Sequence, residues 1–173
     1  NGFEVYLVDQ RNHGLSPHSD EWNYPAMSDD ILELIIDSKL ENVLLLGHSM
    51  GGKSAMHFAV HHCEKISKLV VADIAPKKYP ESNMDIIEGL ISVDLNKLQS
   101  RKEVEGELGK LISETATKQL LLKNLYWKDE GKLAWRFNLK VINDNRDTVG
   151  ETFILGNKSC SAPTLFHRGE KSN

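Results

Sequence analysis

Residues 47–54 read GHSMGGKS and directly follow the apolar run VLLL at 43–46. From Gly47 to Gly51 the stretch matches G-x-S-x-G, the nucleophile elbow, in which a strained turn between a strand and a helix presents a serine hydroxyl above a parallel sheet. Extended to Ser54, it also matches G-x-x-x-x-G-K-[ST], the phosphate-binding P-loop. Both motifs need a buried strand before them and a helix after them. The stretch therefore predicts a strand, a turn and a helix, and leaves two chemistries open.

The segments on either side continue the same alternation of strands and helices. Short apolar runs predict buried strands at 3–8, 43–46, 69–72 and 163–166. An apolar stripe at helical spacing predicts a helix that begins with Ser28 as its N-cap and runs to about Leu40, and a second helix follows from Gly51. This order is typical of βαβ units, so we expect an α/β fold with a mostly parallel sheet and helices on both faces.

The middle of the chain has a different pattern. Helices are expected at 84–91, 104–112 and 115–125, and Trp127 and Trp135 flank a turn that suggests a hairpin or a tight bend. A helical excursion between strands of a parallel sheet is usually a cap or lid over the strand ends, where open sheets bind ligands. We therefore expect a core at 1–79, a helical cap at 80–157 and a return to the core at 158–173.

Composition narrows the choice of partners. The formal net charge is −4 and the pI is about 6.0, which gives no electrostatic reason to expect nucleic acid or an anionic membrane as a partner. No apolar run approaches the ~20 residues that span a bilayer.

Cys63 and Cys160 lack metal-type spacing and are interpreted as free thiols in a reducing, cytoplasmic setting. Histidines 57, 61 and 62 are interpreted as solvated, and no metal or organic cofactor is expected.

The hydrolase interpretation explains more of the GHSMGGKS stretch than the nucleotide interpretation does. Gly47 and Gly51 keep the turn around Ser49 small, and Gly52 lets the helix pack close to the sheet. The backbone N–H of Met50 would then face the oxyanion of acyl transfer. His48 is the variable position before the serine, and on this interpretation Lys53 faces outward without a chemical role.

The P-loop interpretation has one further point in its favour. Asp73 follows the apolar run 69–72, as the Mg²⁺-binding aspartate of P-loop enzymes follows a strand. Against it, residues 48–50 are His, Ser and Met, where a phosphate-binding loop more often has small or turn-favouring residues.

Five motifs in order extend the comparison to nearly the whole chain: VDQRNHGLS at 8–16, GHSMGGK at 47–53, VADIAP at 71–76, WRFN at 135–138 and PTLFHRG at 163–169. Together they resemble the small serine esterases of the α/β-hydrolase superfamily, the YbfF-like group in particular. The resemblance implies that the expected strands at 3–8, 43–46, 69–72 and 163–166 are the fourth to the seventh of that fold.

The resemblance also implies a catalytic triad with Ser49 as nucleophile. Most of the superfamily carries its acid after the seventh strand as G-x-x-D, but this chain has GEKS at 169–172, so Ser172 stands in the acid's place. The YbfF-like group resembles an arrangement with the acid after strand six, which implies Asp73 as the acid that orients the histidine. Ser172 is then an auxiliary hydrogen-bonding partner. Glu170 as the acid, and Asp73 as a simple turn cap, are the alternatives.

The catalytic histidine and the second oxyanion donor are expected outside residues 1–173, and we interpret the chain as an internal fragment that by itself hydrolyses esters negligibly. The resemblance implies hydrolysis of a small-molecule carboxylic ester or thioester through an acyl-enzyme, with no cofactor. A P-loop nucleotidase and a non-catalytic binding protein with the hydrolase fold remain alternatives, and the oligomeric state is left open.

Overall fold

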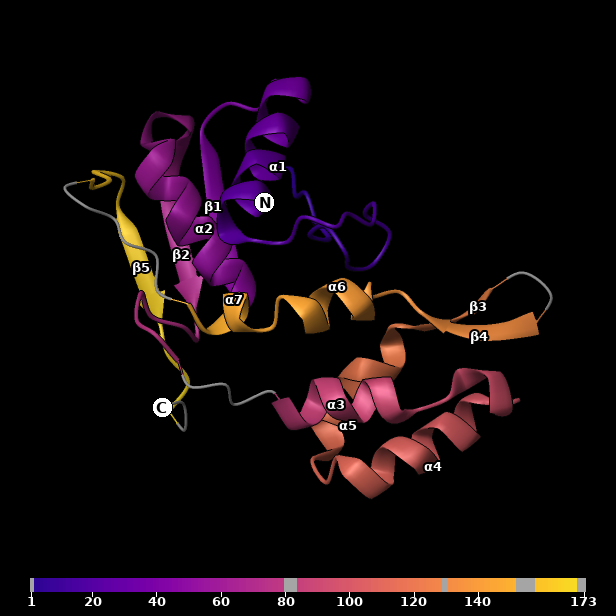
Figure 1. The fold of residues 1–173 in the computed structure, drawn as a ribbon. Helices are drawn as coiled ribbons and strands as arrows, with labels where there is room; N and C mark the ends of the chain where they lie inside the picture. Colours follow the sequence, from indigo (N-terminus) through magenta and orange to yellow (C-terminus); the bar gives the residue numbers. More distant parts are fainter. Residues whose placement is uncertain (1, 80–83, 129–130, 152–157, 171–173) are drawn as a thin grey trace. The chain divides into compact units, whose positions relative to one another are not determined.

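In a computed structural model, residues 2–79, 84–128, 131–151 and 158–170 are described, and the chain divides into two compact units. The sheet unit comprises Glu21–Pro80 and Asp147–Asn173, and the helical unit comprises Asn1–Asp20 and Glu81–Arg146. Both are coloured along the sequence in Figure 1. The division into a core, a cap and a returning segment stays a prediction.

The sheet unit contains a three-stranded parallel sheet (Figure 1). Its strands are β1 (Val43–His48), β2 (Ile66–Ala72) and β5 (Thr164–His167), in the order β1-β2-β5. Both pairings, β1 with β2 and β2 with β5, are parallel. The predicted strands at 43–46, 69–72 and 163–166 are confirmed, and so is the α/β fold class.

Two helices, α1 (Tyr24–Asp37) and α2 (Met50–His61), cover one face of this sheet. Phe58 and Val71 are fully buried in the core between them and the strands. Leu44 and Leu46 lie on the opposite face of β1 and remain 42% and 62% exposed. The unit is completed by η1 (Cys63–Lys65) and α7 (Asp147–Gly150).

Helix α1 begins earlier than predicted. Its N-cap is Asn23, whose side-chain oxygen accepts a hydrogen bond from the backbone N–H of Ala26 at 2.8 Å. Pro25 stands in the first turn, where the missing N–H of proline costs nothing. Ser28, predicted as the N-cap, lies inside the helix and is buried. The prediction was wrong because the Asn23 and Pro25 signals precede the apolar stripe.

The strand predicted at 3–8 is not formed. This segment has no regular secondary structure and is exposed in the helical unit, with Phe3 at 78% and Leu7 at 94%. A strand needs a neighbour to satisfy its backbone groups and cover its side chains, and no described residue pairs with 3–8. Residues 3–8 have the apolar composition of a strand, but a strand also requires a neighbouring strand with which to pair.

The helical unit consists of α3 (Met84–Ser92), η2 (Leu95–Lys97), α4 (Arg101–Leu111), α5 (Thr115–Lys123), β3 (Leu125–Lys128), β4 (Lys132–Trp135) and α6 (Leu139–Asp144). Val104, Leu108 and Leu125 lie at the centre of its own apolar core. The antiparallel β3 and β4 confirm the predicted hairpin, in which Trp127 faces Leu133. The predicted helices at 84–91, 104–112 and 115–125 are confirmed within a few residues.

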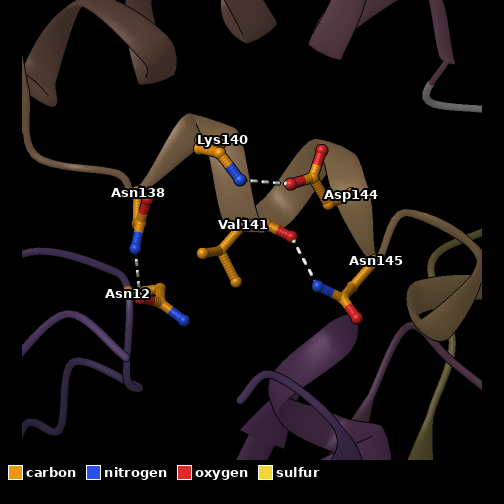
Figure 2. A network of polar contacts seen from close by, with 6 residues as sticks. All are labelled: Asn12, Asn138, Lys140, Val141, Asp144 and Asn145. Atoms are coloured by element: carbon orange, nitrogen blue, oxygen red, sulfur yellow. Dashed lines mark hydrogen bonds and ion pairs between the residues drawn. The ribbon is translucent and has the colours of Figure 1, made fainter. Parts of the chain in front are cut away.

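Asn12 connects two of the sequence motifs inside the helical unit. Its buried side-chain oxygen accepts hydrogen bonds from the Ser19 N–H at 2.8 Å and from the side-chain amide of Asn138 at 3.0 Å, and the latter bond is visible in Figure 2. The backbone N–H of Asn138 also donates to the Asn12 carbonyl. The loop at 8–16 and the segment at 135–138 are therefore joined by a polar contact that sequence spacing does not reveal.

Cys63 and Cys160 form a disulfide, with 5.3 Å between their Cα atoms and 97 residues between them in the sequence. The prediction of free thiols was wrong. Cys63 lies in η1 and Cys160 packs against the apolar core of the sheet unit, so the bond joins the end of α2 to the segment that leads into β5.

No helix in the described parts of the chain is both long enough and apolar enough to cross a bilayer.

His57 is buried in α2, which corrects the prediction of a solvated side chain. Its burial, with the neighbouring His61 stacked at 4.2 Å, lowers the pKa of His57 to about 4. The unfolded chain therefore binds a proton between about pH 6.5 and pH 4 that the folded chain does not, so stability is fully present above that window and falls as the pH drops through it.

We expect the free energy of unfolding to be about 2 kcal/mol lower at pH 5 than at pH 7 because of His57. In the His57→Gln variant this pH dependence should shrink, since glutamine does not titrate. Urea unfolding at the two pH values measures the difference. His167→Gln, at an exposed position of the same unit, is the matched control and should keep the full dependence. An equal loss of pH dependence in both variants would contradict the assignment.

Candidate active site

Ser49 occupies a strained turn between β1 and α2. Its φ of 51° and ψ of −121° lie in a region that residues with a side chain rarely adopt. The N–H of Ser49 donates to the Ala72 carbonyl at 3.0 Å, which holds the turn against the end of β2. Ser49 is exposed. The geometry therefore presents a serine hydroxyl to solvent at the carboxyl end of the sheet.

Two glycines allow the strand and the helix to approach each other at this turn. A Cβ on Gly47 would lie 2.2 Å from the carbonyl oxygen of Gly51, and a Cβ on Gly52 would lie 2.5 Å from a methyl group of Ile74 and 3.1 Å from the Gly47 carbonyl oxygen. Backbone atoms cannot move away as a flexible side chain can. Gly47 therefore has a steric reason to be glycine, and Gly52 has one that also involves the loop after β2.

The first turn of α2 places backbone N–H groups beside the serine. The N–H groups of Gly52 and Lys53 donate to the Ser49 carbonyl at 2.8 and 3.1 Å. Met50 is the first residue of the helix, so its N–H has no helical carbonyl four residues before it. A helix N-terminus favours negative charge. The turn can therefore stabilise an anion that forms beside Ser49.

Asp73 follows β2 at the same edge of the sheet. His48 pairs with Ala72 and Ala72 pairs with His167, so the three strands end in register. Asp73 has a φ of 59°, its N–H donates to the His167 carbonyl at 2.7 Å, and its Oδ1 accepts from the Gly169 N–H at 3.0 Å. The carboxylate is thereby fixed to the loop that follows β5. Asp73 comes one residue after Ala72, whose carbonyl accepts the hydrogen bond from the Ser49 N–H.

The other predicted residues are placed less centrally. His48 is exposed at the end of β1, and Glu170 is exposed after β5. Ser172 lies outside the described residues. The structure therefore brings Ser49, Met50 and Asp73 to one edge of the sheet and adds nothing about Ser172.

The histidines of α2 lie away from Ser49. His57 is eight residues further along the helix, which corresponds to about 12 Å of rise, and His61 and His62 are at its far end. His13 and His18 belong to the helical unit. In the described part of the chain, no group of three or more His, Cys, Asp or Glu side chains is placed to hold a metal ion.

Lys53 is buried, and the prediction that it faces outward was wrong. It is 0% exposed, and its Nζ donates to the carbonyls of Lys77 at 3.0 Å, of Gly150 at 3.2 Å and of Glu151. An ammonium has three N–H donors. Because backbone carbonyls take all three, Lys53 has no donor left for a nucleotide phosphate, and the P-loop interpretation is not favoured.

A parallel sheet with a strained serine turn at the end of one strand, two close-packing glycines and an aspartate at the end of the next strand defines a protein of the hydrolase type. The family model for the alpha/beta hydrolase fold matches residues 1–117, and the chain belongs to this family.

Curated relatives agree with the family match. The mouse (Mus musculus) protein called sn-1-specific diacylglycerol lipase ABHD11 is 37% identical over 99% of this chain and 57% of its own length. Esterase YbfF of Escherichia coli is 34% identical over 83% of this chain and 55% of its own length. The resemblance to the YbfF-like esterases is thus confirmed.

Solved structures give the same result. The structure of a marine microorganism esterase has a TM-score of 0.94 and 40% sequence identity to this chain, and the match covers 97% of this chain and 67% of the other. The chain thus belongs with the esterases and lipases of this fold. It spans about 57% of the length of the mouse relative.

Proposed function

We propose that the protein is a serine hydrolase that cleaves carboxylic esters or thioesters through an acyl-enzyme on Ser49. The observation that carries the proposal is the conformation of this residue, an exposed serine at φ 51° between a strand and a helix N-terminus. Such strain is retained where surrounding structure imposes it, and it concentrates at functional sites. The names of the relatives, which are esterases and lipases, support the same class of reaction.

In the proposed reaction the Ser49 hydroxyl attacks the acyl carbon and the carbonyl oxygen becomes negative. The Met50 N–H donates to this oxygen, and the alcohol or thiol leaves with a proton from the base. Water then attacks the acyl-enzyme and releases the acid. We assign the base to a histidine outside residues 1–173, in agreement with the order serine, acid, histidine of this fold, and Asp73 to its orientation.

The substrate in this proposal is a small acyl ester or thioester, bound without a metal or organic cofactor. The name of the mouse relative makes a diacylglycerol one ester to test. Serine acyl transfer accommodates both oxygen and sulfur leaving groups, so the two classes are separated by assay.

The test is an acylation assay on the intact protein with p-nitrophenyl acetate, an acyl thioester, a diacylglycerol and ATP. We expect an initial burst of nitrophenol equal to the amount of enzyme, and an acetyl group on the peptide that contains Ser49 after rapid acid quenching. Release of phosphate from ATP without any acylated peptide would contradict the proposal. The isolated 173-residue chain, lacking the proposed base, is expected to show negligible turnover.

A further inference from the structure

Lys53 is a fully buried cation in the first turn of α2. Its own N–H donates to the carbonyl of Ser49, so the residue is part of the serine turn. Burying an ammonium is costly unless its donors are satisfied. A lysine in this position therefore needs a local reason, and the proposed acyl transfer does not use its side chain.

The acceptors of the Lys53 ammonium come from two distant segments of the sheet unit. The Lys77 carbonyl lies after β2, whereas the Gly150 and Glu151 carbonyls lie at the end of α7. One side chain thus contacts segments that are 24 and 97 to 98 residues away in the sequence. The rings of Tyr24 and Tyr79, at 5.9 and 5.3 Å from Nζ, add cation–π contacts.

These two segments are the connections to the helical insertion, here defined as residues 81–146. The chain passes from the sheet unit to the insertion after Pro80 and returns at Asp147. Next to Lys53 the two connections also contact each other, because the Tyr79 N–H donates to the Gly150 carbonyl at 3.0 Å. A Cβ on Gly150 would lie 2.8 Å from the backbone carbonyl oxygen of Tyr79, so the two backbones are close.

We propose that Lys53 is a positioning residue whose ammonium fastens both connections of the helical insertion to the helix that begins at Ser49. The outgoing connection is held through Lys77 and the returning connection through Gly150 and Glu151. The ammonium thereby sets where the insertion leaves and re-enters the sheet unit. The part of this inference that concerns substrate rests on the proposed function: the Lys53 ammonium is fully buried and its acceptors are carbonyls of the two connections, so we expect its loss to change KM more than kcat.

Lys53→Met tests the fastening because methionine has similar length and no donor. Three carbonyls would then lose a charge-assisted hydrogen bond, and the two connections would separate more often. Hydrogen exchange of the Tyr79 amide reports this opening directly, since that amide bonds to Gly150. We expect its exchange to become about 10- to 100-fold faster, while amides in the β1 and β2 ladder change little.

The matched control is Lys68→Met, the same change at an exposed position of β2, which should leave the Tyr79 amide as in the parent protein. Unchanged exchange at Tyr79 in Lys53→Met would overturn the inference, because it would show that Lys53 does not hold the connections together. An equal increase across the β1 and β2 amides would also overturn it, because it would show that Lys53 stabilises the whole unit rather than the connections.

Steady-state kinetics test whether Lys53 affects substrate binding. With a p-nitrophenyl ester, Lys53→Met is expected to raise KM about tenfold and to change kcat less than about twofold. A fall in kcat at unchanged KM would contradict the positioning role. If the parent protein hydrolyses no ester, the proposed function fails, and the Tyr79 exchange result still decides whether Lys53 fastens the connections.

Gly150→Ala provides a second route should Lys53→Met fold poorly. The added Cβ pushes the returning connection away from Tyr79 while the lysine stays in place. We expect the same faster exchange of the Tyr79 amide and the same rise in KM. Normal exchange in Gly150→Ala would show that the two connections are held elsewhere and would overturn the proposal.

Discussion

Replacing Asp73 with asparagine is expected to lower kcat for ester hydrolysis by about 10⁴-fold, the loss associated with an acid that no longer orients and charge-stabilises its histidine. The substitution suits the local structure. Asparagine tolerates the φ of 59° at this position, and its amide oxygen can still accept the hydrogen bond from Gly169. The variant should therefore fold normally, so that the lost rate reports the missing charge.

The control for Asp73→Asn is Glu170→Gln, which removes the only other acid considered for this role. Glu170 is exposed after β5, and its replacement should change kcat less than about twofold. Steady-state kinetics on the intact protein distinguish the two. Full activity in Asp73→Asn together with a large loss in Glu170→Gln would transfer the role to Glu170.

Reduction of the Cys63–Cys160 disulfide is expected to lower the free energy of unfolding by about 4 kcal/mol. The bond closes a loop of 97 residues that includes the whole helical insertion, so breaking it frees a large part of the unfolded chain. Urea unfolding with and without dithiothreitol measures the effect on the midpoint.

The double variant Cys63→Ala and Cys160→Ala serves as the control for reduction. It should unfold at the midpoint of the reduced protein and should not respond to dithiothreitol. A thiol titration of the untreated, denatured 173-residue chain is expected to find no free thiol. Two free thiols, with a urea curve that reduction does not move, would show that the bond does not form.

Local sequence was sufficient for the elements that surround Ser49. The apolar run at 43–46, the glycines at 47 and 52 and the run at 69–72 each act on their immediate neighbours, so composition and spacing predicted a strand, a turn and a helix. The start of α1 was also within reach, because Asn23 followed by a proline in the first turn is a recognised start signal.

Properties that depend on distant residues were not predicted. Residues 3–8 have the composition of a strand but no partner strand among the described residues. The burial of Lys53 depends on carbonyls as far away as Glu151, and the pairing of Cys63 with Cys160 is equally remote. One local signal was available for Lys53, since it is the only lysine, arginine or carboxylate in α2. Where a helix buries its single cation, the charge needs hydrogen-bonding partners.

The most direct test of the proposed function is labelling of the intact protein with a fluorophosphonate probe, followed by mass spectrometry of its peptides. We predict a single adduct on Ser49, absent in Ser49→Ala and retained in Ser67→Ala, which removes another exposed serine of the sheet unit. An adduct that persists in Ser49→Ala, or no adduct on a protein that hydrolyses esters, would contradict the account.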